Sequence, residues 1–185
     1  FPTRRSSDLG MMTWYTKSDR YSRAKLNADL ETLRAWYLNR GYLEFNVDST
    51  QVAISPDKQD ISITINIREG RRYIVTGVKL SGDYLGKDEE FRSLVSIRPG
   101  EPYKAEEVAS TQKAFSDRFG LFGHAFARVE LVPRIDRDTG RVEVQLNADP
   151  GRRVYVRRIN VSGNTKTRDE VIRREVRQME GGWYD

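Results

Sequence analysis

The side chains that carry out most catalytic chemistry are almost absent from this sequence. It contains one histidine, His124, and no cysteine. Nucleophilic and metal sites need several such groups held together, and one histidine leaves little to build them from. His124 is expected at a helix end or on the surface, and Asp117 and Glu170 fall at ordinary surface or helix-start positions. The sequence therefore predicts a non-enzyme with no catalytic residue, no metal and no cofactor.

The charged residues carry a mild positive excess. Lys and Arg number 32 against 27 Asp and Glu, which gives a formal net charge of +5. Arginines come in pairs, at Arg71-Arg72, Arg152-Arg153, Arg157-Arg158 and Arg173-Arg174. Such pairs are most often solvated surface, and the alternative is an acidic partner, anionic lipid or nucleic acid. No run of apolar residues approaches the roughly 20 that cross a bilayer, so no membrane span is predicted.

One stretch of the chain occurs twice. Residues 70–82 read Gly-Arg-Arg-Tyr-Ile-Val-Thr-Gly-Val-Lys-Leu-Ser-Gly, and residues 151–163 read Gly-Arg-Arg-Val-Tyr-Val-Arg-Arg-Ile-Asn-Val-Ser-Gly. The offset is 151 − 70 = 81, and Gly41 and Gly123 lie a similar 123 − 41 = 82 apart. Apolar residues alternate in both copies, as in a strand. Repetition at this spacing indicates an array of modules.

The residues before the first copy predict a helix and two strands. The helix begins near Ser22, and Gly41 is a natural C-terminal stop for it. It carries an apolar stripe that consists of Leu26, Leu30, Leu33 and Tyr37. The strand Phe45–Ile54 changes its apolar phase, which predicts a bulge near residues 48–50. Ile61 to Ile67 alternates cleanly with polar residues, which predicts a half-buried central strand.

The residues from 70 to 150 predict one complete module. A strand at about 72–80 is followed by helices at about 88–95 and 105–119, and then by strands at 127–135 and 142–146. Pro133 lacks an amide hydrogen and suits only an edge strand. After Arg152 the pattern starts again, with capping-box spacing at Thr167–Glu170 that predicts a helix. That helix and the residues after it offer apolar side chains to a core, namely Val171, Ile172, Val176 and Met179.

These elements define the domain organisation that we expect. Residues 1–10 show no periodicity that joins them to the helical pattern after them, and they are predicted to be a non-native leader. Residues 11–69 then form the C-terminal part of one module, 70–150 a complete module, and 151–185 the N-terminal part of another. The connectors at residues 69–72 and 150–153 are short, so the modules are expected to form an elongated, semi-rigid rod.

The tandem β-α-α-β-β pattern resembles the POTRA domain. Its opening motif, Gly-x-x-Tyr-x-Val-x-x-Ile/Val-x-Val/Leu-x-Gly, starts the first copy here, and the second copy differs from it only in having Val154 at the Tyr position. Residues 21–34, 40–42, 48–52 and 173–181 resemble more closely the central subunits of the bacterial outer-membrane β-barrel assembly machinery. The resemblance implies an α+β fold of tandem modules, each a three-stranded mixed sheet covered by two helices. It also implies the end of a third module, a whole fourth module and the start of a fifth.

The resemblance further implies a periplasmic array at the outer membrane. Its partners would be unfolded outer-membrane β-barrel proteins and lipoprotein subunits, with no nucleic acid and no small-molecule ligand, and only a missing C-terminal barrel would enter the membrane. Clients would add as strands to a sheet edge, because an exposed edge offers unpaired amides and carbonyls. That edge is expected at Phe45, Val47, Asp48, Thr50, Gln51, Val52 and Ile54, with Gln51 facing outward. The lipoprotein-binding surface is expected at Glu180, Arg177 and Met179.

Two alternatives remain open for the function. The nearer one is another POTRA-containing outer-membrane translocation protein, such as TamA or a two-partner-secretion transporter. The more distant one is a KH-like nucleic-acid-binding module, which has a βααβ core and a GXXG loop. Gly120-Leu-Phe-Gly123 matches that motif, but it comes after the second predicted helix and its middle residues are apolar.

Overall fold

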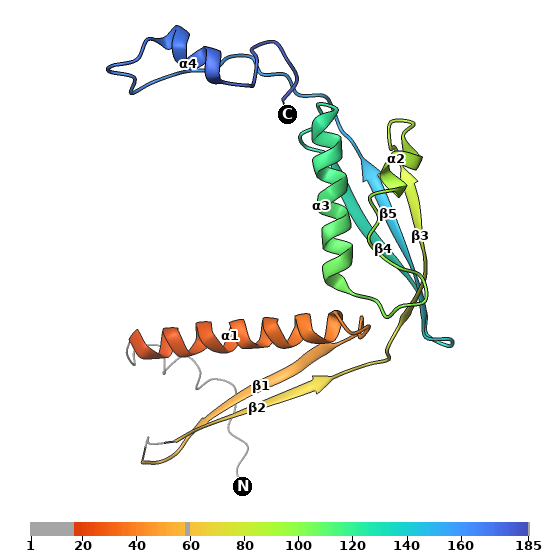
Figure 1. The fold of residues 1–185 in the computed structure, drawn as a ribbon. Coiled ribbons are helices and arrows are strands. Elements are labelled where there is room, and N and C mark those ends of the chain that lie inside the picture. The colour runs from red at the N-terminus through yellow and green to blue at the C-terminus, as the bar shows by residue number, and fades with distance from the viewer. Residues whose placement is uncertain (1–16, 58–59, 185) are drawn as a thin grey trace.

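The computed structural model describes residues 17–57 and 60–184. Three parts succeed one another along an elongated molecule (Figure 1). The first part has the helix α1 (Lys17–Leu38) beside the strands β1 (Asn46–Ile54) and β2 (Ile61–Arg68). Among the described residues, no helix is both long and apolar enough to cross a membrane.

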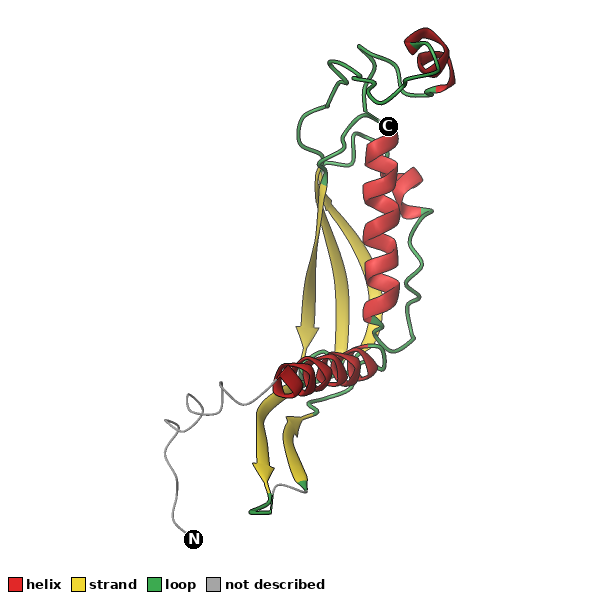
Figure 2. Cartoon of the chain, turned by 90° about the vertical axis from the view of Figure 1, so that its left-hand side faces the viewer, coloured by secondary structure: helices red, strands yellow, loops and turns green. Residues whose placement is uncertain are grey.

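The middle part is the complete module, and it has the predicted β-α-α-β-β order. Its elements are β3 (Ile74–Gly82), α2 (Asp88–Arg92), α3 (Ala105–Leu121), β4 (Arg128–Asp136) and β5 (Arg141–Asp149). The strand order is β3-β5-β4, with β3 parallel and β4 antiparallel to the central β5. Both helices lie on one side of this mixed sheet (Figure 2). The predicted fold class is confirmed.

The core of the middle part is built on the period-two pattern of its central strand. Alternate residues of β5 are buried, namely Val142, Val144, Leu146 and Ala148. Helices α2 and α3 place Phe91, Phe115 and Phe119 against Tyr84, with neighbouring ring centroids 4.4–5.9 Å apart. Each of these four rings is at most 2 % exposed. The helices are therefore held to the sheet mainly by aromatic burial.

Among residues 17–57 and 60–68, the first part lacks the strand and helix that complete this core. Ile61, Ile63, Ile65 and Ile67 lie one repeat before Val142, Val144, Leu146 and Ala148, yet they are 36–61 % exposed. The prediction of a half-buried central strand is wrong for the described residues, because β1 and β2 form a sheet of two strands. The predicted helix does form, and its stripe from Leu26 to Tyr37 is half-buried. The helix ends at Leu38, and Gly41 follows it with φ +96°.

The last part forms less regular structure than the sequence predicted. Residues 152–163 form no strand, and the only pairing there in the described chain is an isolated bridge between Tyr155 and Trp183. In the complete module, β3 pairs with β5. Residues 152–163 correspond to β3, and no counterpart of β5 follows them within the 185 residues. The helix α4 (Asp169–Glu175) forms, but Arg168 precedes it instead of Thr167 and no side chain caps it. The apolar residues of α4 and of the loop after it reach no core, since Val171 is 49 % and Met179 74 % exposed.

An equivalent backbone hydrogen bond is present at each of the two joints between the parts. The amide of Tyr73 donates to the carbonyl of Gly41 (2.8 Å), and one repeat later Val154 donates to Gly123 (2.9 Å). A side chain at Gly41 would meet the Tyr73 carbonyl oxygen at 2.9 Å, so the strand start lies directly against the helix end. The joint is thus set by a glycine that both ends a helix and admits the next strand.

Candidate functional site

The start of β1 is anchored under the end of α1. Phe45, one residue before the strand, is 5 % exposed and stacks on Tyr37 with ring centroids 4.2 Å apart. The hydroxyl of Tyr37 in turn donates to Glu69 (2.6 Å), just beyond β2. The side chain of Phe45 therefore holds the start of the strand in place and is not part of the exposed edge.

A bulge at Asp48 divides β1, as the change of apolar phase predicted. Val47 pairs with Ile67 and Ser49 with Asn66, so Asp48 has no partner in the register. Its carboxylate accepts a hydrogen bond from Asn46 (3.0 Å) and forms an ion pair with Arg68 (3.2 Å). The bulge therefore has its own polar support and marks where the regular edge begins.

Beyond the bulge, alternation decides which amides face outward. The Ser55 amide donates to the Asp60 carbonyl (2.9 Å) at the end of the pair. From that pair toward the bulge, the register is regular, so hydrogen-bonded residue pairs alternate with pairs whose amides and carbonyls point away from the partner strand. The amides of Thr50, Val52 and Ile54 consequently face away from β2, and no described strand pairs with them. The expectation that Gln51 faces outward is wrong for its backbone, because its amide faces β2.

The other sheet edges are poorer templates. In the complete module the counterpart of β2 is the central strand β5, which pairs with β3 on one side and with β4 on the other. The free edge of β2 therefore corresponds to the edge of β5 that β3 occupies. Strand β4 carries Pro133, which has no amide hydrogen, and its Val129 carbonyl already accepts a hydrogen bond from Gln112 of α3 (2.9 Å). The predicted edge position of Pro133 is confirmed. The start of β3 is covered by residues 100–103, which bond to Tyr73 and Val75.

The predicted partner residues share the loop after α4. Arg177 and Met179 are exposed and line a cleft together with Tyr155 and Trp183. The carboxylate of Glu180 accepts hydrogen bonds from the Ile159 amide (2.9 Å) and from the Arg173 guanidinium (3.0 Å). These two bonds favour the charged form and lower the pKa of Glu180. Its charge is therefore partly used within the loop.

The described chain contains no metal site and no GXXG loop between two helices, and its one histidine stands alone. His124 comes after the end of α3 as expected but is 7 % exposed, so a surface position is wrong. Its Nδ1 lies 3.2 Å from the Gly151 carbonyl, at the joint to the last part. No group of metal-ligating side chains occurs among residues 17–57 and 60–184. Gly120 lies within α3 and Gly123 ends it at φ +84°, so Gly120–Gly123 is not a loop between two helices.

Comparison with known proteins identifies the repeat. The family model described as "POTRA: Surface antigen variable number repeat" matches residues 5–70, 73–151 and 154–185. The chain belongs to the POTRA family. The three matches agree with the POTRA pattern read from the repeat, and the middle match covers the module from β3 to β5.

Outer membrane protein assembly factors are among the proteins that this chain resembles. The outer membrane protein assembly factor BamA of Neisseria meningitidis serogroup B is 34% identical over 177 residues, which cover 95% of this chain and 22% of that protein. BamA of Buchnera aphidicola is 32% identical over 165 residues, covering 89% and 27%. The chain thus spans about a quarter of the length of these relatives.

A solved structure matches the arrangement of the modules as well. The crystal structure of Haemophilus influenzae BamA POTRA3-5 superposes with a TM-score of 0.78 at 30% identity, covering 86% of this chain and 63% of that one. BamA from Haemophilus ducreyi lacking POTRA domains 1-3 gives a TM-score of 0.54 at 31% identity, covering 60% and 21%.

Sequence reasoning missed the side chains that join the modules. Two such side chains contact the complete module. Asn39 contacts Glu106, and Glu44 contacts Tyr73 and Arg137. Aligning the helix ends at Gly41 and Gly123 could have drawn attention to them, since Leu121 and Phe126 stand at the same two positions. Their partners are distant in sequence and could not be read from local pattern.

Proposed function

We propose that this chain is the periplasmic POTRA region of an outer-membrane protein assembly factor of the BamA type. It would run from the end of a third module, through a fourth, to the start of a fifth, on the periplasmic face of the outer membrane. The relatives named BamA and the matching arrangement of Haemophilus influenzae POTRA3-5 support this placement. In this role the chain binds and positions polypeptides, with no chemical step.

We further propose that unfolded β-barrel clients add as strands to the outer edge of β1. The observation that carries this proposal is the run of outward amides at Thr50, Val52 and Ile54, between the bulge and the turn. Main-chain pairing is tolerant of client sequence, which suits many different barrel strands. One net hydrogen bond contributes only about 0.5–1.5 kcal/mol, so an edge of this length binds weakly. Several modules acting together would raise the overall affinity.

A proline placed by parity tests the edge. Val52→Pro removes an outward amide hydrogen without touching the ladder to β2, so binding of a barrel-strand peptide should be lost while the fold is kept. Val52→Ala is the matched control, because it shortens the side chain and keeps the amide. Amide shifts during peptide titration provide the measurement. Shifts confined to α1 or α3 would show that clients bind helices instead of the strand.

We propose that Glu180, Arg177 and Met179 contact a lipoprotein subunit. Their common loop and the exposed side chains of Arg177 and Met179 support a protein-binding surface. Because Glu180 also holds the Ile159 amide, reversing its charge would disturb the loop as well as the surface. Arg177→Glu and Met179→Ala are cleaner tests, since no described residue forms a hydrogen bond or ion pair with either side chain. Unchanged co-purification of lipoproteins with both full-length variants would remove this loop from the interface.

A further inference from the structure

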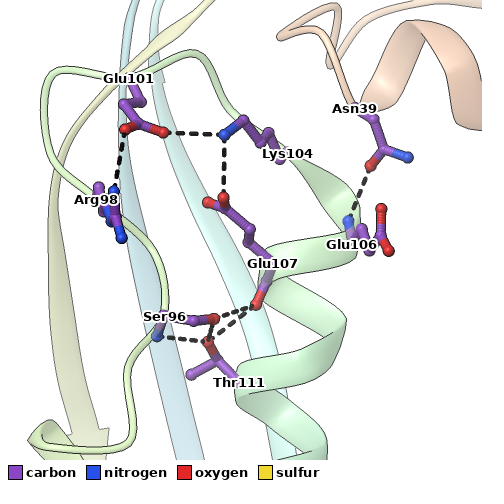
Figure 3. A network of polar contacts seen from close by, with 8 residues as sticks. All are labelled: Asn39, Ser96, Arg98, Glu101, Lys104, Glu106, Glu107 and Thr111. Atoms are coloured by element: carbon purple, nitrogen blue, oxygen red, sulfur yellow. Dashed lines mark hydrogen bonds and ion pairs between the residues drawn. The ribbon is translucent and has the colours of Figure 1, made fainter.

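The joint between the first part and the complete module is locked by polar side chains. Lys104 precedes α3 and its side chain makes no cap. The missing acceptor comes from the preceding module, where the Asn39 side-chain oxygen accepts a hydrogen bond from the Glu106 amide (2.9 Å; Figure 3). One module therefore caps a helix of the next.

Glu44 forms the second part of this lock. Its carboxylate accepts one hydrogen bond from the Tyr73 hydroxyl (2.9 Å) and another from the Arg137 guanidinium (2.6 Å). Arg137 belongs to the turn between β4 and β5, and Arg71 also donates to the backbone carbonyls of that turn (2.7 and 2.9 Å). Asn39 and Glu44 thus hold two separate points of the following module, its second helix and its last turn.

The last part begins as the complete module does. Val156 donates to the Gly182 carbonyl (2.9 Å) as Val75 does to Glu101 (2.9 Å), one 81-residue repeat earlier. The same offset relates the Tyr184–Val154 bond (2.8 Å) to the Tyr103–Tyr73 bond (3.1 Å). Tyr103 lies two residues before α3, so a helix equivalent to α3 is expected to begin just beyond Tyr184.

At this second joint the two locking positions are apolar. Counting 82 residues from Asn39 and Glu44 gives Leu121 and Phe126. Neither side chain can accept a hydrogen bond, so neither can cap a helix or form an ion pair. Leu121 is 50 % exposed and Phe126 is 77 % exposed in this structure.

We propose that Leu121 and Phe126 form an apolar seat for the following module of the same chain. Leu121 would contact the N-terminal turn of that module's second helix, where Asn39 contacts α3. Phe126 would contact the turn between its last two strands, where Glu44 contacts Arg137. The second joint is then held by burial of apolar surface, whereas the first is held by directed polar contacts. The proposal rests on the module repeat and is independent of client binding.

The first test measures solvent protection. Hydroxyl-radical labelling should modify Leu121 and Phe126 in the 185-residue chain, and this modification should be lost in the full-length protein. Val132 of β4, which is 42 % exposed, is a control whose modification should persist. Modification of Leu121 and Phe126 that persists in the full-length protein would overturn the proposal.

The second test measures the joints separately. Spin labels placed on either side of each joint of the full-length protein report its distance distribution. Leu121→Ala with Phe126→Ala should broaden the distribution across the second joint alone, and Asn39→Ala with Glu44→Ala should broaden it across the first joint alone. An unchanged second joint in the Leu121/Phe126 variant would refute the apolar seat, whatever the outcome of peptide binding.

Discussion

Gly82→Ala should destabilise the complete module strongly. Gly82 ends β3 at φ +86°, a region that L-residues rarely adopt. A Cβ atom there would lie 2.1 Å from the Ala148 carbonyl oxygen and 2.8 Å from its amide nitrogen. Both atoms belong to the backbone of the central strand β5, which cannot move aside without breaking its own pairing.

Three costs add up at this position. Left-handed backbone costs a residue with a Cβ about 1–2 kcal/mol. Moving the end of β3 away from β5 costs roughly 1–3 kcal/mol, as overpacking usually does. The displacement also breaks the hydrogen bond from the Asp83 amide to the Ala148 carbonyl (2.9 Å), a loss of about 0.5–1.5 kcal/mol. A total of about 3 kcal/mol or more is a large share of the about 5–15 kcal/mol that stabilises a typical domain.

Thermal unfolding followed by circular dichroism measures this effect. At about 4–8 °C per kcal/mol for a module of this size, Tm should fall by at least about 12 °C. The matched control is Gly163→Ala, one repeat later, where φ is +85° but no atom lies within 4 Å of the added Cβ. That variant should leave the main transition unchanged. Equal effects at the two glycines, or a Gly82→Ala shift of only a few degrees, would refute the steric argument.

Three further predictions concern the core, the first joint and the overall shape. Burial raises the pKa of Tyr84 to about 12, and its hydroxyl donates to the Leu146 carbonyl (2.8 Å), so Tyr84→Phe should remove one late-titrating phenol in an alkaline absorbance titration and cost about 1 kcal/mol in urea unfolding. Hydrogen bonds from Arg137 and Tyr73 lower the pKa of Glu44 in the folded state. The contribution of Glu44 to folding stability is therefore present above the unfolded pKa of about 4.3 and is lost as the pH falls through the folded pKa. Tm of the Glu44→Gln variant should consequently depend less on pH between 5 and 3. Small-angle scattering should give a radius of gyration above the roughly 16 Å of a compact domain of 185 residues, and a compact profile would contradict the module array.

Local sequence patterns identify the repeat and the class of each main element. Alternation along β5 identified a buried strand, since period two places every second side chain on the same face. Pro133 identified an edge and Gly41 a helix stop, because each acts through its own backbone chemistry. The phase change in β1 located its bulge. All of these signals are local, and none depends on a distant partner.

Tertiary structure alone decided the features that need such a partner. The 81-residue repeat predicted two strands, but only β3 forms, because only β3 has β5 beside it. The sequence places Gln51 and Val52 in the same strand, and pairing with β2 determines which of the two amides remains open. Asn39 looks like an ordinary residue after a helix until α3, 67 residues later, brings the Glu106 amide to it. A residue's type limits the bonds it can form, and the long-range fold determines which group it meets.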